Sequence, residues 1–231
     1  MKLGLLTYNI GKDWDLEKII EICRTWGYAG VEFRSDAGHK HGVELEANKE
    51  ERKIVKEKLE DAYLEAIGVG TSCRFEYSDA KLRRQNIDTA KRYVELAAEI
   101  EAPRIRVFGN NFEENTDKED TIKWVGEALA ELNEFSKPFE VDVLLEMHGE
   151  FNFWKYAMKA VEYSGIPNLG LVYNCSTKDK VGDSVKSTYS RVKQLIRHVH
   201  MHSFLKPYPY KELLQLLKDQ VDDVFVSFGT T

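Results

Sequence analysis

The stretch Val141-Asp142-Val143-Leu144-Leu145-Glu146-Met147-His148 is a short apolar run that ends in a carboxylate and an imidazole. Two other segments have a similar form: residues 30–34 lead to His39 and His41, and residues 197–202 alternate histidine with apolar residues. These three segments contain all six histidines of the chain. An α/β barrel builds its site from polar groups at the C-terminal ends of parallel strands. The pattern therefore predicts a functional mouth at one end of a barrel.

Strand-like runs alternate with helical stripes along the whole chain. We expect eight strands, over residues 3–8, 30–34, 68–74, 104–108, 141–146, 169–174, 198–202 and 224–228, with seven helices between them. Such alternation implies parallel pairing under a cover of helices, and eight strands suit a closed barrel. The predicted fold is a (β/α)8 TIM barrel, one domain over residues 1–231, lacking the last helix. An open doubly wound sheet is the alternative, although residues 7–12 contain no glycine-rich phosphate loop.

The first helical stripe has recognisable ends. Leu16, Ile19 and Cys23 recur at helical spacing, Asp15 stands where an N-cap would lie, and Gly27 follows the stripe. A short acidic side chain favours the N-cap, and glycine favours the left-handed position after a helix. The spacing predicts a helix between Asp15 and Gly27.

Composition excludes several classes of protein. No apolar run approaches the roughly 20 residues that a membrane-spanning helix needs. The net charge of -6 disfavours a broad nucleic-acid surface, because phosphate binding needs clustered Lys and Arg. Cys23, Cys73 and Cys175 are widely spaced and form no CxxC pair, which is typical of reduced thiols. We expect a cytoplasmic protein.

Polar residues share the inner faces of the expected strands, since side chains alternate along a strand. Burying such groups is costly unless they pair with one another or bind a ligand. One carboxylate and several imidazoles can hold a divalent cation, with Mn, Co or Zn fitting mixed donors better than Mg or Ca. The residues expected on these faces are Glu32, Arg34, Glu146, His148, Asn174, His198, His200 and His202.

Other interpretations of these residues remain open. Glu146 can instead form a salt bridge with Arg106 or Arg34, and His200 can be a hydrogen-bonded core imidazole. His198, at the start of its strand, is expected to be a core residue. The loop that carries His39 and His41 is either a lid over the mouth or a solvated loop.

At these residues the chain resembles the xylose isomerase-like TIM barrel superfamily, the sugar phosphate isomerase/epimerase group. The resemblance covers nearly the whole chain, and members include isomerases, epimerases, dehydratases and metal-dependent apurinic endonucleases. The motifs that carry it are GVEFR at 30–34, GHKHGVE at 38–44, RQNI at 84–87, APRIRVFG at 102–109, LLEMHG at 144–149 and HVHM at 198–201.

The resemblance implies a metal site with Glu from the fifth strand, Asp from the sixth, His from the seventh and Glu from the eighth. Glu146 and His200 match the first and third positions. Asn174 stands where the Asp is expected, and Gly229 replaces the last Glu, which also belongs to the acid/base pair of the family. Both changes remove negative charge.

We therefore expect an isomerase- or epimerase-like protein that acts on a small sugar or sugar derivative by proton transfer. Glu146 and His200 are the predicted catalytic residues and ligands of a divalent metal (Mn, Co, Zn or Mg). A non-catalytic polyol-binding barrel or partner subunit is the alternative, an apurinic endonuclease ranks last, and a homodimer is possible along the edge without a helix. The residues expected to bind substrate are Glu32, Arg34, Arg106, His148, Asn174 and His202.

Overall fold

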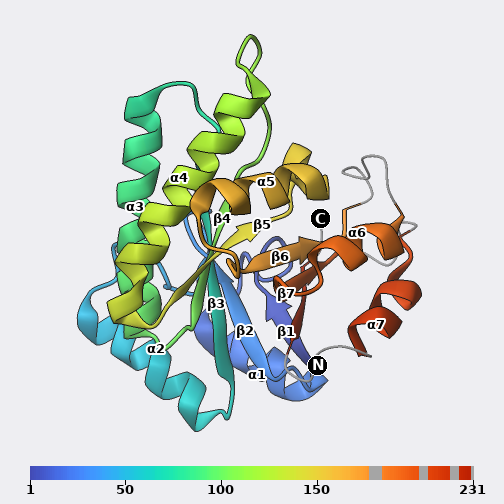
Figure 1. The fold of residues 1–231 in the computed structure, drawn as a ribbon. Coiled ribbons are helices and arrows are strands. Elements are labelled where there is room, and N and C mark those ends of the chain that lie inside the picture. Colours follow the sequence, from blue (N-terminus) through green and yellow to red (C-terminus); the bar gives the residue numbers. More distant parts are fainter. Residues whose placement is uncertain (177–183, 203–207, 219–223, 230–231) are drawn as a thin grey trace.

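The protein forms a closed barrel of eight parallel strands in chain order, which confirms the predicted TIM barrel (Figure 1). The computed structural model describes residues 1–176, 184–202, 208–218 and 224–229. The first and last strands pair in parallel, so the sheet has no free edge. The strands are β1 (Lys2–Leu6), β2 (Gly30–Arg34), β3 (Glu65–Arg74), β4 (Arg104–Phe108), β5 (Asp142–Glu146), β6 (Leu171–Asn174), β7 (Ile196–Met201) and β8 (Phe225–Phe228).

Helices connect successive strands and lie outside the barrel, with α3 and α4 adjacent on one flank (Figure 1). Among the described residues, which end at Gly229, no helix follows β8. None of the described helices is both long and apolar enough to span a bilayer. The helices are α1 (Leu16–Trp26), α2 (Lys49–Asp61), α3 (Ala80–Glu99), α4 (Lys118–Ser136), α5 (Trp154–Ser164), α6 (Val185–Val192) and α7 (Tyr210–Lys218), and two 3-10 turns are η1 (Lys137–Phe139) and η2 (Gly149–Asn152).

The predicted ends of α1 are confirmed. The Asp15 carboxylate accepts a hydrogen bond from the Lys18 backbone N–H at 2.9 Å, and Gly27 has a left-handed φ of 71°. Strand ends differ more: β3 begins at Glu65 rather than residue 68, because its first residues pair with β2 from Gly30 onward. β7 covers residues 196–201, so His202 lies just beyond its end.

The lower part of the barrel is filled by apolar side chains opposite glycines. A Cβ at Gly4 would lie 2.4 Å from Ile67, and a Cβ at Gly170 would lie 2.3 Å from Leu144. Ile67 and Leu144 are almost completely buried. Small and large residues therefore interlock in the lumen, as the layers of a TIM barrel do, and the polar residues gather above them.

The three cysteines offer a test of this packing. All three are free and buried. Burial raises the pKa of Cys23 to about 12 and that of Cys73 to about 11, and it also raises the pKa of Cys175. Because the thiolate is the reactive form, we expect folded protein at pH 8 to react with Ellman's reagent at least about a hundredfold more slowly than a free thiol. Denatured protein should release three equivalents, and fast reaction of any thiol in the folded state would contradict the packing.

Candidate active site

A cavity of about 650 Å³ opens at the C-terminal ends of the strands. Its wall is built from the ends of β2, β3, β4, β5 and β7 and from the loops that follow them, so the predicted mouth exists. The lining side chains include three arginines, three histidines and two carboxylates: Arg34, Arg74, Arg106, His148, His200, His202, Asp36 and Glu146.

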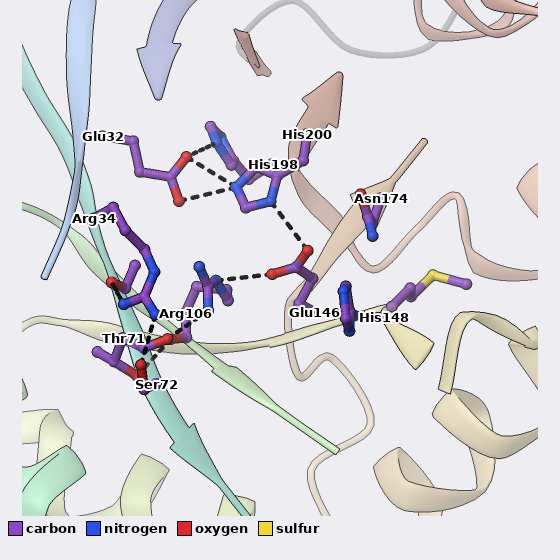
Figure 2. Close-up of polar contacts among 12 residues, drawn as sticks. Glu32, Arg34, Thr71, Ser72, Arg106, Glu146, His148, Asn174, His198 and His200 are labelled. Carbon is purple, nitrogen blue, oxygen red and sulfur yellow. Dashed lines mark hydrogen bonds and ion pairs between the residues drawn. The ribbon is translucent and has the colours of Figure 1, made fainter. Parts of the chain in front are cut away.

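Glu32, His198 and His200 meet across the lumen beneath this cavity. His198 Nε2 lies 2.7 Å from Glu32 Oε2, and His200 Nε2 lies 2.9 Å from both Glu32 oxygens. All three residues are buried. Glu32 belongs to β2 and both histidines to β7, and β1 and β8 separate these strands. The contact therefore runs through the barrel interior and ties opposite walls together (Figure 2).

His200 faces a carboxylate on each side of its ring. Its Nε2 faces Glu32, and its Nδ1 lies 3.3 Å from Glu146 Oε1. A carboxylate only accepts hydrogen bonds, so this geometry requires a proton on each ring nitrogen. Burial by itself would lower the pKa of His200, but the charges of Glu32 and then Glu146 outweigh it and raise that pKa to about 9. His200 is therefore an imidazolium at neutral pH.

Glu146 lies between two cations. Arg106 Nε is 2.8 Å from Glu146 Oε2, and His200 approaches the other oxygen. Burial would raise the pKa of Glu146, but Arg106 and then His200 lower it to about 2. The Arg106 N–H does not point along a hydrogen bond, so within the described chain Glu146 Oε2 is a buried acceptor without a donor.

Arg106 reaches Glu146 over the backbone of β3. Its Nη1 donates to the carbonyl oxygen of Thr71, and a Cβ at Gly70 would lie only 2.9 Å from its Nη2. Glycine at position 70 therefore leaves the room that the guanidinium needs. The series Glu32, His200, Glu146, Arg106 alternates negative and positive charge, and Figure 2 shows these four side chains in contact in that order.

His148 is held by residues that the sequence did not single out. Its Nδ1 lies 3.0 Å from Asn110 Oδ1, and Asn110 Nδ2 donates to Glu76 at 3.4 Å. Because the amide oxygen only accepts, His148 Nδ1 carries the proton and its neutral form has the lone pair on Nε2. Asn110 and Glu76 lie in loops after β4 and β3, outside any periodic pattern, so strand alternation gave no signal for them.

The structure gives other surroundings to Asn174 and Gly229, the positions where the resemblance implies acidic ligands. Asn174 Oδ1 accepts a hydrogen bond from His202 Nε2 at 2.6 Å. Gly229 is buried, and a Cβ there would lie 2.9 Å from Leu6 Cδ2. A glutamate at position 229 would therefore require Leu6 to move.

The structure groups the predicted site residues differently from the sequence. Glu146, His200 and Arg106 lie together, and the open alternative of an Arg106 salt bridge is realised. His198 was expected in the core and is buried, but it also contacts Glu32. In the loop after β2, His39 and His41 are buried and neither lines the cavity. Their neighbours Gly38, Lys40 and Gly42 are exposed.

One group of side chains in the described part of the chain has donor atoms close enough to hold a metal ion. Its members are Glu32, His198 and His200, whose ligand atoms lie within 4.8 Å of one another. His198 Nδ1 is buried without a hydrogen-bond partner in the described residues. Glu146 is not in this group, so the carboxylate next to the imidazoles here comes from β2 rather than β5.

Comparisons with known proteins agree with the fold. A family model described as a xylose isomerase-like TIM barrel matches residues 20–227. No curated protein matches the chain by sequence.

Three solved structures illustrate the likeness. A D-psicose 3-epimerase solved with D-fructose has a TM-score of 0.82 at 15% identity, over 99% of this chain and 84% of its own. The 3-keto-D-glucoside 4-epimerase of E. coli has a TM-score of 0.82 at 15% identity, over 99% and 91%. The IolI protein with a bound zinc atom has a TM-score of 0.81 at 18% identity, over 99% and 88%. At these identities the likeness shows the fold.

The paired position of His200 predicts a pH dependence. Its folded pKa of about 9 lies above the ordinary 6.5, so its stabilising contribution is complete below pH 6.5 and is lost as pH rises through about 9. At about 1.4 kcal/mol per pKa unit, the free energy of unfolding should fall by a few kcal/mol over this range.

NMR of the histidine rings measures the same effect directly. His200 should titrate near pH 9, whereas His41, whose pKa burial lowers to about 4, serves as the internal comparison. Urea unfolding at pH 6.5, 7.5 and 8.5 gives the stability. Titration of His200 at or below pH 6.5 would contradict the imidazolium between two carboxylates.

Proposed function

Because the chain belongs to the xylose isomerase-like TIM barrel family, we propose that it is an isomerase or epimerase of a small sugar or sugar derivative. The observation that carries the proposal is a buried carboxylate, Glu146, that faces the mouth cavity between the cations Arg106 and His200. Two of the similar structures are named as epimerases of sugars, namely a D-psicose 3-epimerase and a 3-keto-D-glucoside 4-epimerase. These names support a sugar as the substrate class.

The cavity has the size and polarity for such a ligand. Its volume of about 650 Å³ lies in the range of roughly 300–1,000 Å³ that holds small organic molecules. Charged and amide side chains line most of it, including Arg34, Arg74 and Asn110. A polyhydroxylated molecule can hydrogen-bond to these groups, whereas an apolar ligand would leave them unpaired.

Proton transfer next to a carbonyl group needs a base and a positive charge near the carbonyl oxygen. Removal of a proton from the neighbouring carbon leaves negative charge on that oxygen, and preorganised cations stabilise it. Glu146 Oε2, a buried acceptor without a described donor, is the base. Because Arg106 and His200 lower the pKa of Glu146 to about 2, it becomes an effective base only as these two cations shift their charge to the oxygen of the substrate. Arg106 and His200 supply the positive charge on either side of it.

His148 offers a second proton acceptor on the same wall. The hydrogen bond from its Nδ1 to Asn110 directs the lone pair of the neutral ring to Nε2. An isomerase or epimerase must also return the proton to the substrate. In the proposal Glu146 keeps the proton it removes, and His148, protonated on both ring nitrogens, donates its Nε2 proton to the substrate. In the reverse direction the neutral ring accepts a proton at Nε2 and Glu146 gives its proton back.

The donor set of Glu32, His198 and His200 fits a divalent cation. One carboxylate and two imidazoles suit Zn, Co or Mn better than Mg. When bound there, such a cation would supply Lewis acidity beneath the cavity. His200 must lose a proton before it can act as a ligand, so the imidazolium and the cation compete for the same nitrogen.

Replacing Glu146 tests the proposed reaction. Glu146→Gln keeps the size of the side chain but removes the base and the negative charge, so turnover should fall by about a hundredfold or more. The measurement is NMR of deuterium incorporation from D2O at the carbon next to the carbonyl, across a panel of ketopentoses and ketohexoses with and without a carboxylate or phosphate group.

Glu150→Gln is the matched control. Glu150 follows the same strand, but its carboxylate accepts from the Phe112 N–H at 2.7 Å and does not line the cavity. This variant should exchange at the wild-type rate. Unchanged exchange in Glu146→Gln, with its fold checked by circular dichroism, would refute the role of Glu146.

Metal binding should depend on Glu32 and not on Glu146. Glu32→Gln removes the carboxylate of the ligand group, so the affinity for Zn²⁺ should fall by about tenfold or more. Glu146→Gln removes one of the two carboxylates that hold the proton on His200, so the affinity should stay the same or rise. Competition with a chromophoric chelator at pH 8 measures both. Loss of affinity in Glu146→Gln instead would place the cation between Glu146 and His200.

A further inference from the structure

Arg34 is a buried cation without an acidic partner. Arg34 is the last residue of β2, and only 9% of the residue is exposed. Its guanidinium donates to the carbonyl oxygens of Ser35 and Gly70 and to Ser72 Oγ, all of them neutral acceptors. No carboxylate in the described part of the chain lies within ion-pair distance of it. A buried charge is normally paired, because its desolvation is otherwise uncompensated.

The other buried arginine differs in this respect. Arg106 is 5% exposed and ion-paired with Glu146 at 2.8 Å. Arg74, on the same side of the cavity, is partly exposed and has Glu76 at 3.5 Å. Arg34 is therefore the cation in the cavity wall that has no ion pair with the described residues, although the negative charge of Asp36 acts on it from the same wall.

Arg34 and Arg106 are held close together on the same short segment of β3. Arg34 binds the Gly70 carbonyl and the Ser72 hydroxyl, and Arg106 binds the Thr71 carbonyl between them (Figure 2). Burial and then repulsion by Arg106 lower the pKa of Arg34 to about 10, which still leaves it charged at neutral pH. The fold thus keeps two like charges close together where the cavity begins.

The backbone around Arg34 is also fixed. The buried His41 donates from Nε2 to the Arg34 carbonyl at 3.0 Å, and the Thr7 hydroxyl accepts from the Arg34 N–H at 2.8 Å. Burial lowers the pKa of His41 to about 4, so its ring is neutral and fixes the backbone at Arg34 without adding charge. The guanidinium is consequently held in place before any ligand binds, as a preorganised binding group must be.

We propose that Arg34 binds an anionic group, a carboxylate or a phosphate, and that the ligand of the mouth is an anionic sugar derivative rather than a neutral sugar. Calling that ligand a substrate rests on the proposed function, whereas the anion site itself does not. A guanidinium suits both oxyanions because its N–H groups form a planar fork. Ser72 and the neighbouring Arg74 complete the wall around the anion. The rest of the ligand then extends past Arg106 toward Glu146 (Figure 2).

Three ligands with the same three-carbon skeleton test the proposal. Glycerol is neutral, D-glycerate carries a carboxylate and glycerol 3-phosphate carries a phosphate. Isothermal titration of the wild-type protein should detect at least one of the anions with at least tenfold higher affinity than glycerol. The tighter of the two identifies the anionic group. Equal affinity for all three would overturn the proposal.

Variants separate binding from structural support. Arg34→Met should weaken the preferred anion by at least tenfold and leave glycerol unaffected, and Arg34→Lys should restore part of the affinity. Arg104→Met is the control. Arg104 is a half-buried arginine at the N-terminal end of β4, away from the cavity, and its Nη1 donates to the Arg197 carbonyl. This variant should bind like the wild type. Wild-type affinity in a folded Arg34→Met protein would overturn the proposal.

If Arg34→Met does not fold, NMR of the arginine Nε–H signals of the wild-type protein tests the same site. The Arg34 signal, assigned by its absence in Arg34→Lys, should shift on addition of the preferred anion, and an unmoved signal would overturn the proposal. Anion binding without deuterium exchange would support this site and count against the proposed enzyme. Exchange of neutral ketoses without anion binding would support the enzyme and overturn the anion site.

Discussion

The imidazolium of His200, held between Glu32 and Glu146, is the interaction on which the upper half of the barrel depends. It joins β7 to β2 and β5, which are not neighbours in the sheet, and so ties three walls together through the lumen. Removing one partner of such a buried group leaves an unpaired charge, which typically costs about 3–5 kcal/mol. Arg106 extends the series by one more cation, and the four charges together sum to zero.

The barrel pattern could be predicted because its signals are local. Period-two alternation placed Glu146 and His200 on inner faces, and the alternation of strands with helices gave the closed sheet. The pairing of Glu32 with His198 could not be predicted, because it depends on how far opposite strands are offset across the lumen. His198 was assigned to the core from its place near the strand start, although it shares a face with His200 two residues later. Asn110 and Glu76 lie in loops, where no period indicates their direction.

Neutral residues at positions 174 and 229, where the resemblance implies acids, fit this charge balance. A carboxylate at either position would add a third negative charge to this end of the barrel, while the cations in contact with Glu32 and Glu146 are His200 and Arg106. Asn174 instead accepts a hydrogen bond from His202, and the space next to Gly229 is filled by the Leu6 side chain. The site thus balances two carboxylates with protein cations. A divalent ion can enter only by displacing the proton that His200 now holds.

This balance also determines what a ligand meets. Because Glu32, His200, Glu146 and Arg106 neutralise one another, their attraction for a distant charge is small, and they act on atoms that come into contact with them. Arg34 stands outside the series, with neutral partners only. It forms no ion pair with the described residues, although Asp36 attracts it from the same wall. It lies on the opposite side of Arg106 from Glu146 (Figure 2). We therefore propose that the mouth separates a position that selects charge, Arg34, from a position that moves a proton, Glu146. A ligand that uses both would have an anion at one end and a reactive carbon at the other.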